Sequence, residues 1–237
     1  MFYGYGYYID PTYWLVLIGA LLCLIASAMV NSTYSKYAKY ASMSGMTGAE
    51  AAARILSYSG VNDVTIEHVK GELTDHFDPR KKVVRLSDST YNSTSVAAIS
   101  VAAHECGHVL QHHEGYVPIK IRTALVPAAN IGSKLGIPII LLGVLLSWNQ
   151  LLIQIGIWVF ALAVLFQLVT LPVEFNASSR ALAAVQRFGI LGENEIGSGK
   201  KVLRAAAMTY VAAAASSILQ LLRLVLLFGN RGSRSRD

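Results

Sequence analysis

Four of the chain's six histidines fall between residues 101 and 113, in the stretch VAAHECGHVLQHH. His104 and His108 are four residues apart and Glu105 follows the first of them, which is the pattern H-E-x-x-H. On a helix this spacing puts two Cβ atoms about 5–6 Å apart on one face, so both imidazoles can reach one metal ion. The glutamate can take a proton from a metal-bound water, whose pKa the metal lowers to about 7. The pattern therefore predicts a hydrolytic zinc site.

The neighbouring residues narrow the kind of site. Three histidines in one line on one helix cannot surround a metal tetrahedrally, so we expect His112 to be solvated or to support a ligand. Cys106 faces away from the two histidines and is expected to be a small buried residue. Metzincins place a helix-breaking glycine and a third ligand at positions that Gln111 and Glu114 occupy here. The third ligand must therefore come from another part of the chain.

Glu174 is the best candidate for that third ligand. It is the first charged residue after the uncharged run 135–173. A catalytic zinc commonly takes two histidines and a glutamate, and an ionisable residue at the membrane border is a functional candidate by default. The glutamates of LGENEIGSG lie in a Gly-rich turn, which would position a ligand poorly. The alternative interpretation is an interfacial Glu174 paired with Arg180.

The composition predicts a membrane protein. Hydrophobic residues make up 54% of the chain and charged residues 14%, against about 25% charged in soluble domains. The run 11–35 carries no charge, and 135–173 can supply two spans of roughly 20 residues with SWNQ (147–150) as their turn. A fourth apolar run, 205–228, contains Arg223. We expect three to four transmembrane helices, the first of them a retained anchor.

Basic residues predict the orientation in the membrane. No Lys or Arg precedes the first span, whereas Lys36 and Lys39 follow it at once, and more basic residues flank the later spans. Since Lys and Arg favour cytoplasmic flanks, the N-terminus is expected outside and residues 31–134 in the cytoplasm. The same rule explains the net charge of +6 without nucleic acid as a partner.

The polar part between the first two spans contains signals for short elements. TGAE (47–50) is a capping box that opens a helix. VTIEHV (64–69) and KVVRLS (82–87) are expected to form a small sheet. A Ser or Thr at 93–95 can cap the helix that carries the histidines, and Gly115 can end it.

Three stretches, AAHECGHVLQH, LPVEFNASSRAL and KKVLRAAAMTYVAAA, resemble the bacterial membrane zinc metallopeptidases of the YugP type over nearly the whole chain. That family is similar to HtpX and the CAAX prenyl proteases, which are gluzincins. The resemblance implies His104, His108 and Glu174 as ligands of one zinc ion and Glu105 as general base. It also implies KVVRLS as the edge strand on which an extended peptide aligns.

The chain departs from HtpX-like enzymes on the second ligand helix. These enzymes carry Glu-x-x-Ala-Asp where this chain has Glu174-Phe-Asn-Ala-Ser178, so the acidic residue that orients a histidine is absent. Asn176 or Ser178 could hydrogen-bond a ligand histidine instead. Tyr210 and His112 are candidates for stabilising an oxyanion.

The leading interpretation is an integral-membrane zinc endopeptidase that hydrolyses peptide bonds at the cytoplasmic face of the cell membrane. The alternative is a metal-binding membrane scaffold or adaptor without turnover, but a structural zinc has no use for Glu105 and is usually closed by four protein ligands. A metal transporter would need ionisable residues inside the spans, where only Lys134 and Arg223 come close. The expected partners are a polypeptide substrate, with membrane proteins among the candidates, and the lipid bilayer.

The predicted fold class is a mainly α integral membrane protein with a small zincin-like α+β cytoplasmic domain. In chain order we expect an aromatic N-terminal segment (1–12), a transmembrane anchor (13–30), the cytoplasmic metallopeptidase part (31–121), a transmembrane hairpin (122–173), a cytoplasmic helix with the third ligand (174–204), a fourth membrane helix (205–228) and a basic tail (229–237).

Overall fold

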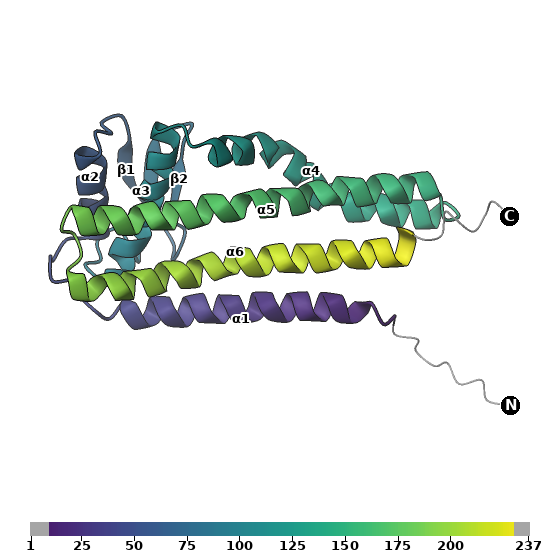
Figure 1. Cartoon of the computed structure of the whole chain (residues 1–237), viewed down its shortest axis with the longest axis horizontal. Coiled ribbons are helices and arrows are strands. Elements are labelled where there is room, and N and C mark those ends of the chain that lie inside the picture. The colour runs from purple at the N-terminus through teal and green to yellow at the C-terminus, as the bar shows by residue number, and fades with distance from the viewer. Residues whose placement is uncertain (1–9, 230–237) are drawn as a thin grey trace, which may run out of the picture. The chain divides into compact units, whose positions relative to one another are not determined.

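The computed structural model describes residues 10–229, and this part of the chain forms six helices and one three-stranded sheet (Figure 1). The elements are α1 (Tyr13–Tyr37), α2 (Gly48–Tyr58), β1 (Thr65–Val69), β2 (His76–Asp78), β3 (Val83–Ser87), α3 (Val96–His113), α4 (Val117–Leu145), α5 (Gln150–Arg187) and α6 (Glu193–Phe228). Helices α1, α4, α5 and α6 are long and apolar enough to cross a membrane. The predicted class, a mainly α membrane protein with a small α+β part, is confirmed. Most of the predicted aromatic segment and of the basic tail lies outside the described residues.

The chain divides into two compact units. Within the described residues, the first contains 10–25, 125–168 and 212–229, and the second contains 26–124 and 169–211. The first unit consists mainly of parts of the long apolar helices α1, α4, α5 and α6. The second unit contains the remaining parts of these helices, the sheet and every residue considered for the metal site.

Small residues hold α4 and α5 together in the first unit. A Cβ atom at Gly132 would lie 2.5 Å from the Val159 carbonyl oxygen, and one at Gly156 would lie 2.5 Å from the Ile140 side chain. Such contacts let apolar helices approach closely in a membrane, where van der Waals packing drives association. The two helices are joined at SWNQ (147–150), as predicted.

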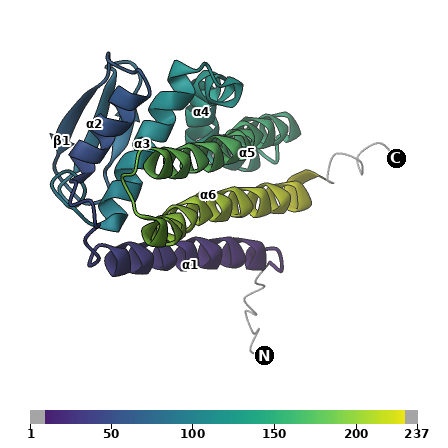
Figure 2. The same cartoon turned by 60° about the vertical axis from the view of Figure 1, so that its left-hand side comes forward.

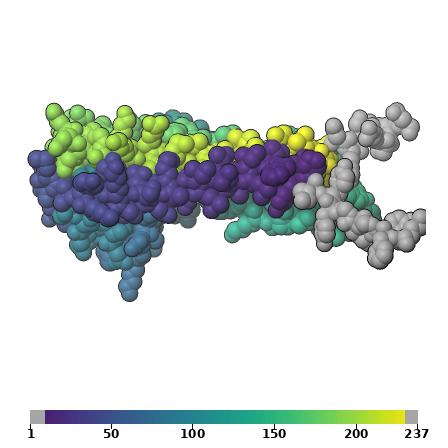
Figure 3. Space-filling view, turned by 90° about the horizontal axis from the view of Figure 1, so that it is seen from below, coloured from purple at the N-terminus to yellow at the C-terminus, as the bar shows by residue number. Residues whose placement is uncertain are grey.

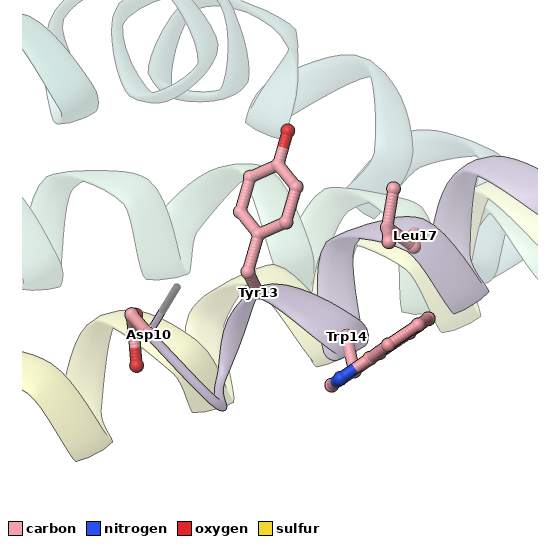
Figure 4. Close-up of a pocket in the computed structure, with 4 residues that line it drawn as sticks. All are labelled: Asp10, Tyr13, Trp14 and Leu17. Atoms are coloured by element: carbon pink, nitrogen blue, oxygen red, sulfur yellow. The ribbon is translucent and has the colours of Figure 1, made fainter. Parts of the chain in front are cut away.

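Arg223, the charged residue of the fourth apolar run, has a partner inside the first unit. Its Nη2 atom lies 3.4 Å from Asp10 Oδ2, and its guanidinium lies 5.7 Å from the centre of the Tyr13 ring. Asp10 and Tyr13 also line a hollow with Trp14 and Leu17 (Figure 4). Because Asp10 precedes α1 and Arg223 lies near the end of α6, their pairing brings the start of α1 next to the end of α6.

The start of α1 presents apolar side chains to its surroundings. Trp14, Leu21 and Leu24 are 66%, 56% and 67% exposed, and in Figure 3 the purple helix lies uncovered along the face that is seen. A large exposed apolar surface of this kind marks a membrane-facing region.

In the second unit, the sheet has the order β1-β3-β2. β3 pairs in parallel with β1 and antiparallel with β2. The prediction that KVVRLS forms an edge strand is therefore wrong, because β3 is the central strand. Its side chains are consistent with this place, since Val83, Val84 and Leu86 are all buried, which is the pattern of a strand covered on both faces.

Local sequence signals fix the two short helices that lie beside the sheet (Figure 2). The capping box at α2 is present: Glu50 N donates to Thr47 Oγ1 at 3.2 Å, and Thr47 N donates to Glu50 Oε2 at 2.8 Å. Ser95 caps α3 by accepting a hydrogen bond from Ala98 N at 3.1 Å. Residues of α2, β3, α3, α5 and α6 share one buried core, which fixes α3 against the other elements.

Candidate metal centre

α3 carries His104, Glu105 and His108, and α5 carries Glu174, and the fold brings the two sets together. Glu174 Oε2 lies 3.2 Å from His104 Nε2 and 3.5 Å from His108 Nε2. The possible ligand atoms of these three residues all lie within 4.8 Å of one another. These three residues, His104, His108 and Glu174, are the ones that the sequence predicted as ligands. The prediction used the spacing of the two histidines and the position of Glu174 directly after the uncharged run.

The donor set fits zinc. Two imidazole nitrogens and one carboxylate oxygen are the protein ligands of many catalytic zinc sites, whereas Ca²⁺ and Mg²⁺ prefer oxygen ligands throughout. Glu174 is only 1% exposed, and its Oε1 atom is buried without a hydrogen-bond partner. Burying such an atom is costly unless a charge or a donor compensates it. The Oε1 atom lies toward an arginine of α4, and a metal ion at the histidines would compensate the charge at Oε2.

A cationic side chain lies on the other side of Glu174. Arg122 Nη1, near the start of α4, is 3.6 Å from Glu174 Oε1. The alternative pairing of Glu174 with Arg180 is wrong, because Arg180 Nη1 lies 2.6 Å from Glu114 Oε2. The two oxygens of Glu174 therefore differ: Oε2 faces the histidines and Oε1 faces the arginine.

Each histidine has a partner for its second ring nitrogen. His104 Nδ1 lies 3.2 Å from Ser178 Oγ, so one of the two predicted candidates does contact a histidine. The other candidate, Asn176, does not. His108 Nδ1 lies 3.0 Å from Oε1 of Gln111, a residue that from the sequence is notable only as a departure from the metzincin pattern. Its position three residues after His108, on the same helix face, was the signal that could have found it.

The general-base candidate is not engaged by another charged group. Glu105 is 8% exposed, and within residues 10–229 its carboxylate makes no hydrogen bond or ion pair. Burial lowers the pKa of His108, but the hydrogen bond to Glu174 and the charges of Glu105 and Glu174 outweigh it and raise this pKa. Tyr210 of α6 lies near the carboxylates of both Glu105 and Glu174.

Two further residues of α3 lie outside the group that can hold a metal. Cys106 is fully buried, as predicted, and burial raises the pKa of its thiol. The His112 ring packs against Phe77 of β2, with 5.5 Å between ring centres, and burial lowers its pKa.

Gly107 allows the two ligand-bearing helices to approach. A Cβ atom at this position would collide with the carbonyl oxygen of Ala177, three residues beyond Glu174. The obstacle is backbone, so it cannot move aside as a flexible side chain can. The sequence of α3 thus places its glycine where α5 comes closest.

We expect Gly107→Ala to separate α3 from α5. The introduced methyl overpacks a well-packed contact, which should lower the free energy of unfolding by about 1–3 kcal/mol and weaken zinc binding. The matched control is Gly197→Ala in α6, where a Cβ atom would meet nothing within 4 Å. This control should raise stability by about 0.5–1 kcal/mol, because alanine is the better helix former. Thermal unfolding and zinc titration of both variants measure the difference, and equal behaviour would refute the close contact.

The sequence comparisons agree with this chemistry. A sequence model of the family described as "Putative neutral zinc metallopeptidase" matches residues 12–229. The Bacillus subtilis (strain 168) protein named "Putative membrane protease YugP" is 48% identical over 205 residues, which are 86% of this chain and 91% of that protein. No solved structure matches the chain. The chain belongs to the neutral zinc metallopeptidase family.

Proposed function

We propose that the chain is an integral-membrane zinc endopeptidase of the gluzincin type. In this proposal His104, His108 and Glu174 hold one zinc ion, and Glu105 is the general base. The observation that carries it is the position of Glu174 Oε2, within 3.5 Å of both histidine Nε2 atoms although it comes from another helix. Three ligands leave a zinc position open for water or substrate, as catalytic sites require.

In the proposed hydrolysis, the bound zinc and Glu105 have different roles. Bound zinc supplies a water of lowered pKa and a Lewis acid for the peptide carbonyl. Glu105 would accept a proton from the attacking water as the water oxygen adds to the carbonyl carbon, and would pass that proton to the amine nitrogen as the C–N bond breaks. The position of Glu105 suits this role, because within residues 10–229 no hydrogen bond or ion pair occupies its carboxylate.

An extended substrate would need a free strand edge. β3 offers none, since it is paired on both sides, whereas β2 is paired only with β3 among the described residues. Phe77 of β2 packs against His112, one helical turn after His108. We therefore assign peptide alignment to the free edge of β2, where backbone hydrogen bonds would add the substrate as a further strand.

A scaffold without turnover is the competing function. It is disfavoured because the candidate group has three protein ligands rather than four and because Glu105 is left without a structural partner. The deciding experiment is cleavage of a denatured protein by the zinc-loaded chain in detergent, compared with the Glu105→Gln variant and with chelator-treated protein. Cleavage that survives both treatments would exclude the proposal, as would stoichiometric zinc binding with no cleavage.

The proposed site faces the cytoplasm. Lys36 and Lys39 follow the apolar part of α1 directly, and Lys and Arg favour cytoplasmic flanks. Reporter fusions after Lys39 and after Arg187 should therefore report cytoplasm, and a fusion within 147–150 should report the outside. A fusion near residue 60 that reports the outside would reverse the orientation while leaving the proposed chemistry intact.

A further inference from the structure

Gln111 is a fully buried polar side chain whose hydrogen-bonding groups all find partners. It is 0% exposed. Its Nε2 donates to the Val173 carbonyl oxygen at 2.8 Å and to Asn176 Oδ1 at 3.0 Å, and its Oε1 lies 3.0 Å from His108 Nδ1. Three hydrogen bonds thus connect one amide to a candidate ligand histidine on α3 and to two residues of α5.

These partners fix which way the amide points. The Val173 carbonyl can only accept, so the amide nitrogen must face it. Asn176 Oδ1 also accepts from Arg180 Nε at 2.7 Å, which confirms that the Asn176 oxygen faces Gln111. Arg180 is held in turn by Glu114 at 2.6 Å. With its nitrogen committed to α5, Gln111 must present its oxygen to His108.

An amide oxygen cannot donate, so the hydrogen bond requires a proton on His108 Nδ1. In a neutral imidazole this leaves the lone pair on Nε2, the atom that faces Glu174 Oε2 at 3.5 Å. The contact of His104 with Ser178 is different, because a hydroxyl can either donate or accept. The two histidines are therefore held in unequal ways.

We propose that Gln111 is the positioning residue that fixes the tautomer and ring orientation of His108 for metal binding. The inference rests on the proposed zinc site and goes beyond it by assigning a role to a residue that contacts neither metal nor substrate. A ligand histidine whose second nitrogen is held in this way binds metal more tightly, and loss of the partner typically costs about 10- to 100-fold in affinity. Gln111 takes the part that an acidic residue often plays in zinc enzymes.

The test compares a substitution that removes both polar groups of the amide with one that removes only its NH2 donor. Gln111→Met keeps the approximate volume and removes every hydrogen bond, so the zinc dissociation constant of the full-length protein should rise about 10- to 100-fold. Gln111→Glu keeps an acceptor for His108 and should bind zinc within about threefold of wild type. Its second oxygen meets the Val173 carbonyl, so its metal-free form should melt at a lower temperature. Affinity is measured by competition with a chelator.

The control for a purely structural effect is Ile99→Val, a fully buried position of α3 that contributes to the hydrophobic core. It should lower the melting temperature and leave zinc affinity unchanged. Unchanged affinity in Gln111→Met, or equal losses in Gln111→Met and Gln111→Glu, would overturn the inference. If Gln111→Met does not fold, Gln111→Glu decides, and a tenfold loss of affinity there overturns it. Wild-type protein that fails to bind zinc would instead overturn the proposed function.

Discussion

Glu105→Gln is expected to bind zinc as tightly as wild type and to hydrolyse a denatured substrate about 10²- to 10⁴-fold more slowly. The carboxamide has nearly the same shape as the carboxylate, so the helix and both histidines keep their positions. It cannot accept a proton at neutral pH, so the transfer from water to the leaving amine is lost. Because Glu105 makes no hydrogen bond or ion pair within the described part of the chain, the substitution breaks no structural contact there.

The measurement needs zinc content and cleavage rate from the same preparation. Glu67→Gln is the matched control: it makes the same chemical change on β1, at a glutamate that pairs with Arg85 at 3.2 Å and takes no part in the candidate site. This variant should retain full activity. If Glu105→Gln lost zinc together with activity, Glu105 would be a ligand or a structural residue rather than the base.

Features encoded by neighbouring residues were predictable from the sequence. The capping box at Thr47 and a cap within residues 93–95 depend on contacts within one turn of helix, and the four apolar runs are visible in the composition. The structure contains the capping box, a cap at Ser95 and four long apolar helices. The spacing of His104 and His108 belongs to the same class, because a single helix determines it.

Features that depend on which elements meet were harder to predict. The family resemblance implied that KVVRLS is an edge strand, and β2, which covers its second edge, has only three residues, too few for a periodic pattern. The alternative interpretation of Glu174 paired it with Arg180 on its own helix, whereas the structure places Arg122 of α4 beside it. Gln111 lies three residues after His108, a spacing that allows contact, but the direction of its amide depends on facing residues of α5 that the sequence does not identify.

Glu174 itself could be selected from the sequence because its setting is unusual. A carboxylate that directly follows a long uncharged run needs a compensating charge, whichever element supplies it. The structure buries this carboxylate between two imidazoles and one guanidinium. Because Glu174 lies against both histidines, we expect its removal to affect zinc binding directly.

Glu174→Ala is expected to weaken zinc binding by more than about 100-fold, because a direct ligand should contribute more than the 10- to 100-fold typical of residues behind a ligand. It removes the only carboxylate among the three candidate ligands, so that only His104 and His108 remain to bind the metal. Zinc at 100 times its dissociation constant stabilises a folded protein by about 2.7 kcal/mol, so the zinc-dependent rise in melting temperature should disappear.

Glu193→Ala provides the comparison for Glu174→Ala. Glu193 is an exposed glutamate in the first turn of α6, outside the candidate group, and its removal should leave the zinc-dependent rise intact. A Glu174→Ala protein that keeps this rise would show that Glu174 is an interfacial carboxylate held by Arg122, and the third ligand would have to be sought elsewhere. Loss of zinc in Glu174→Ala, combined with retained zinc and lost cleavage in Glu105→Gln, would separate the ligand from the base, since neither a scaffold nor a structural glutamate predicts that pair of results.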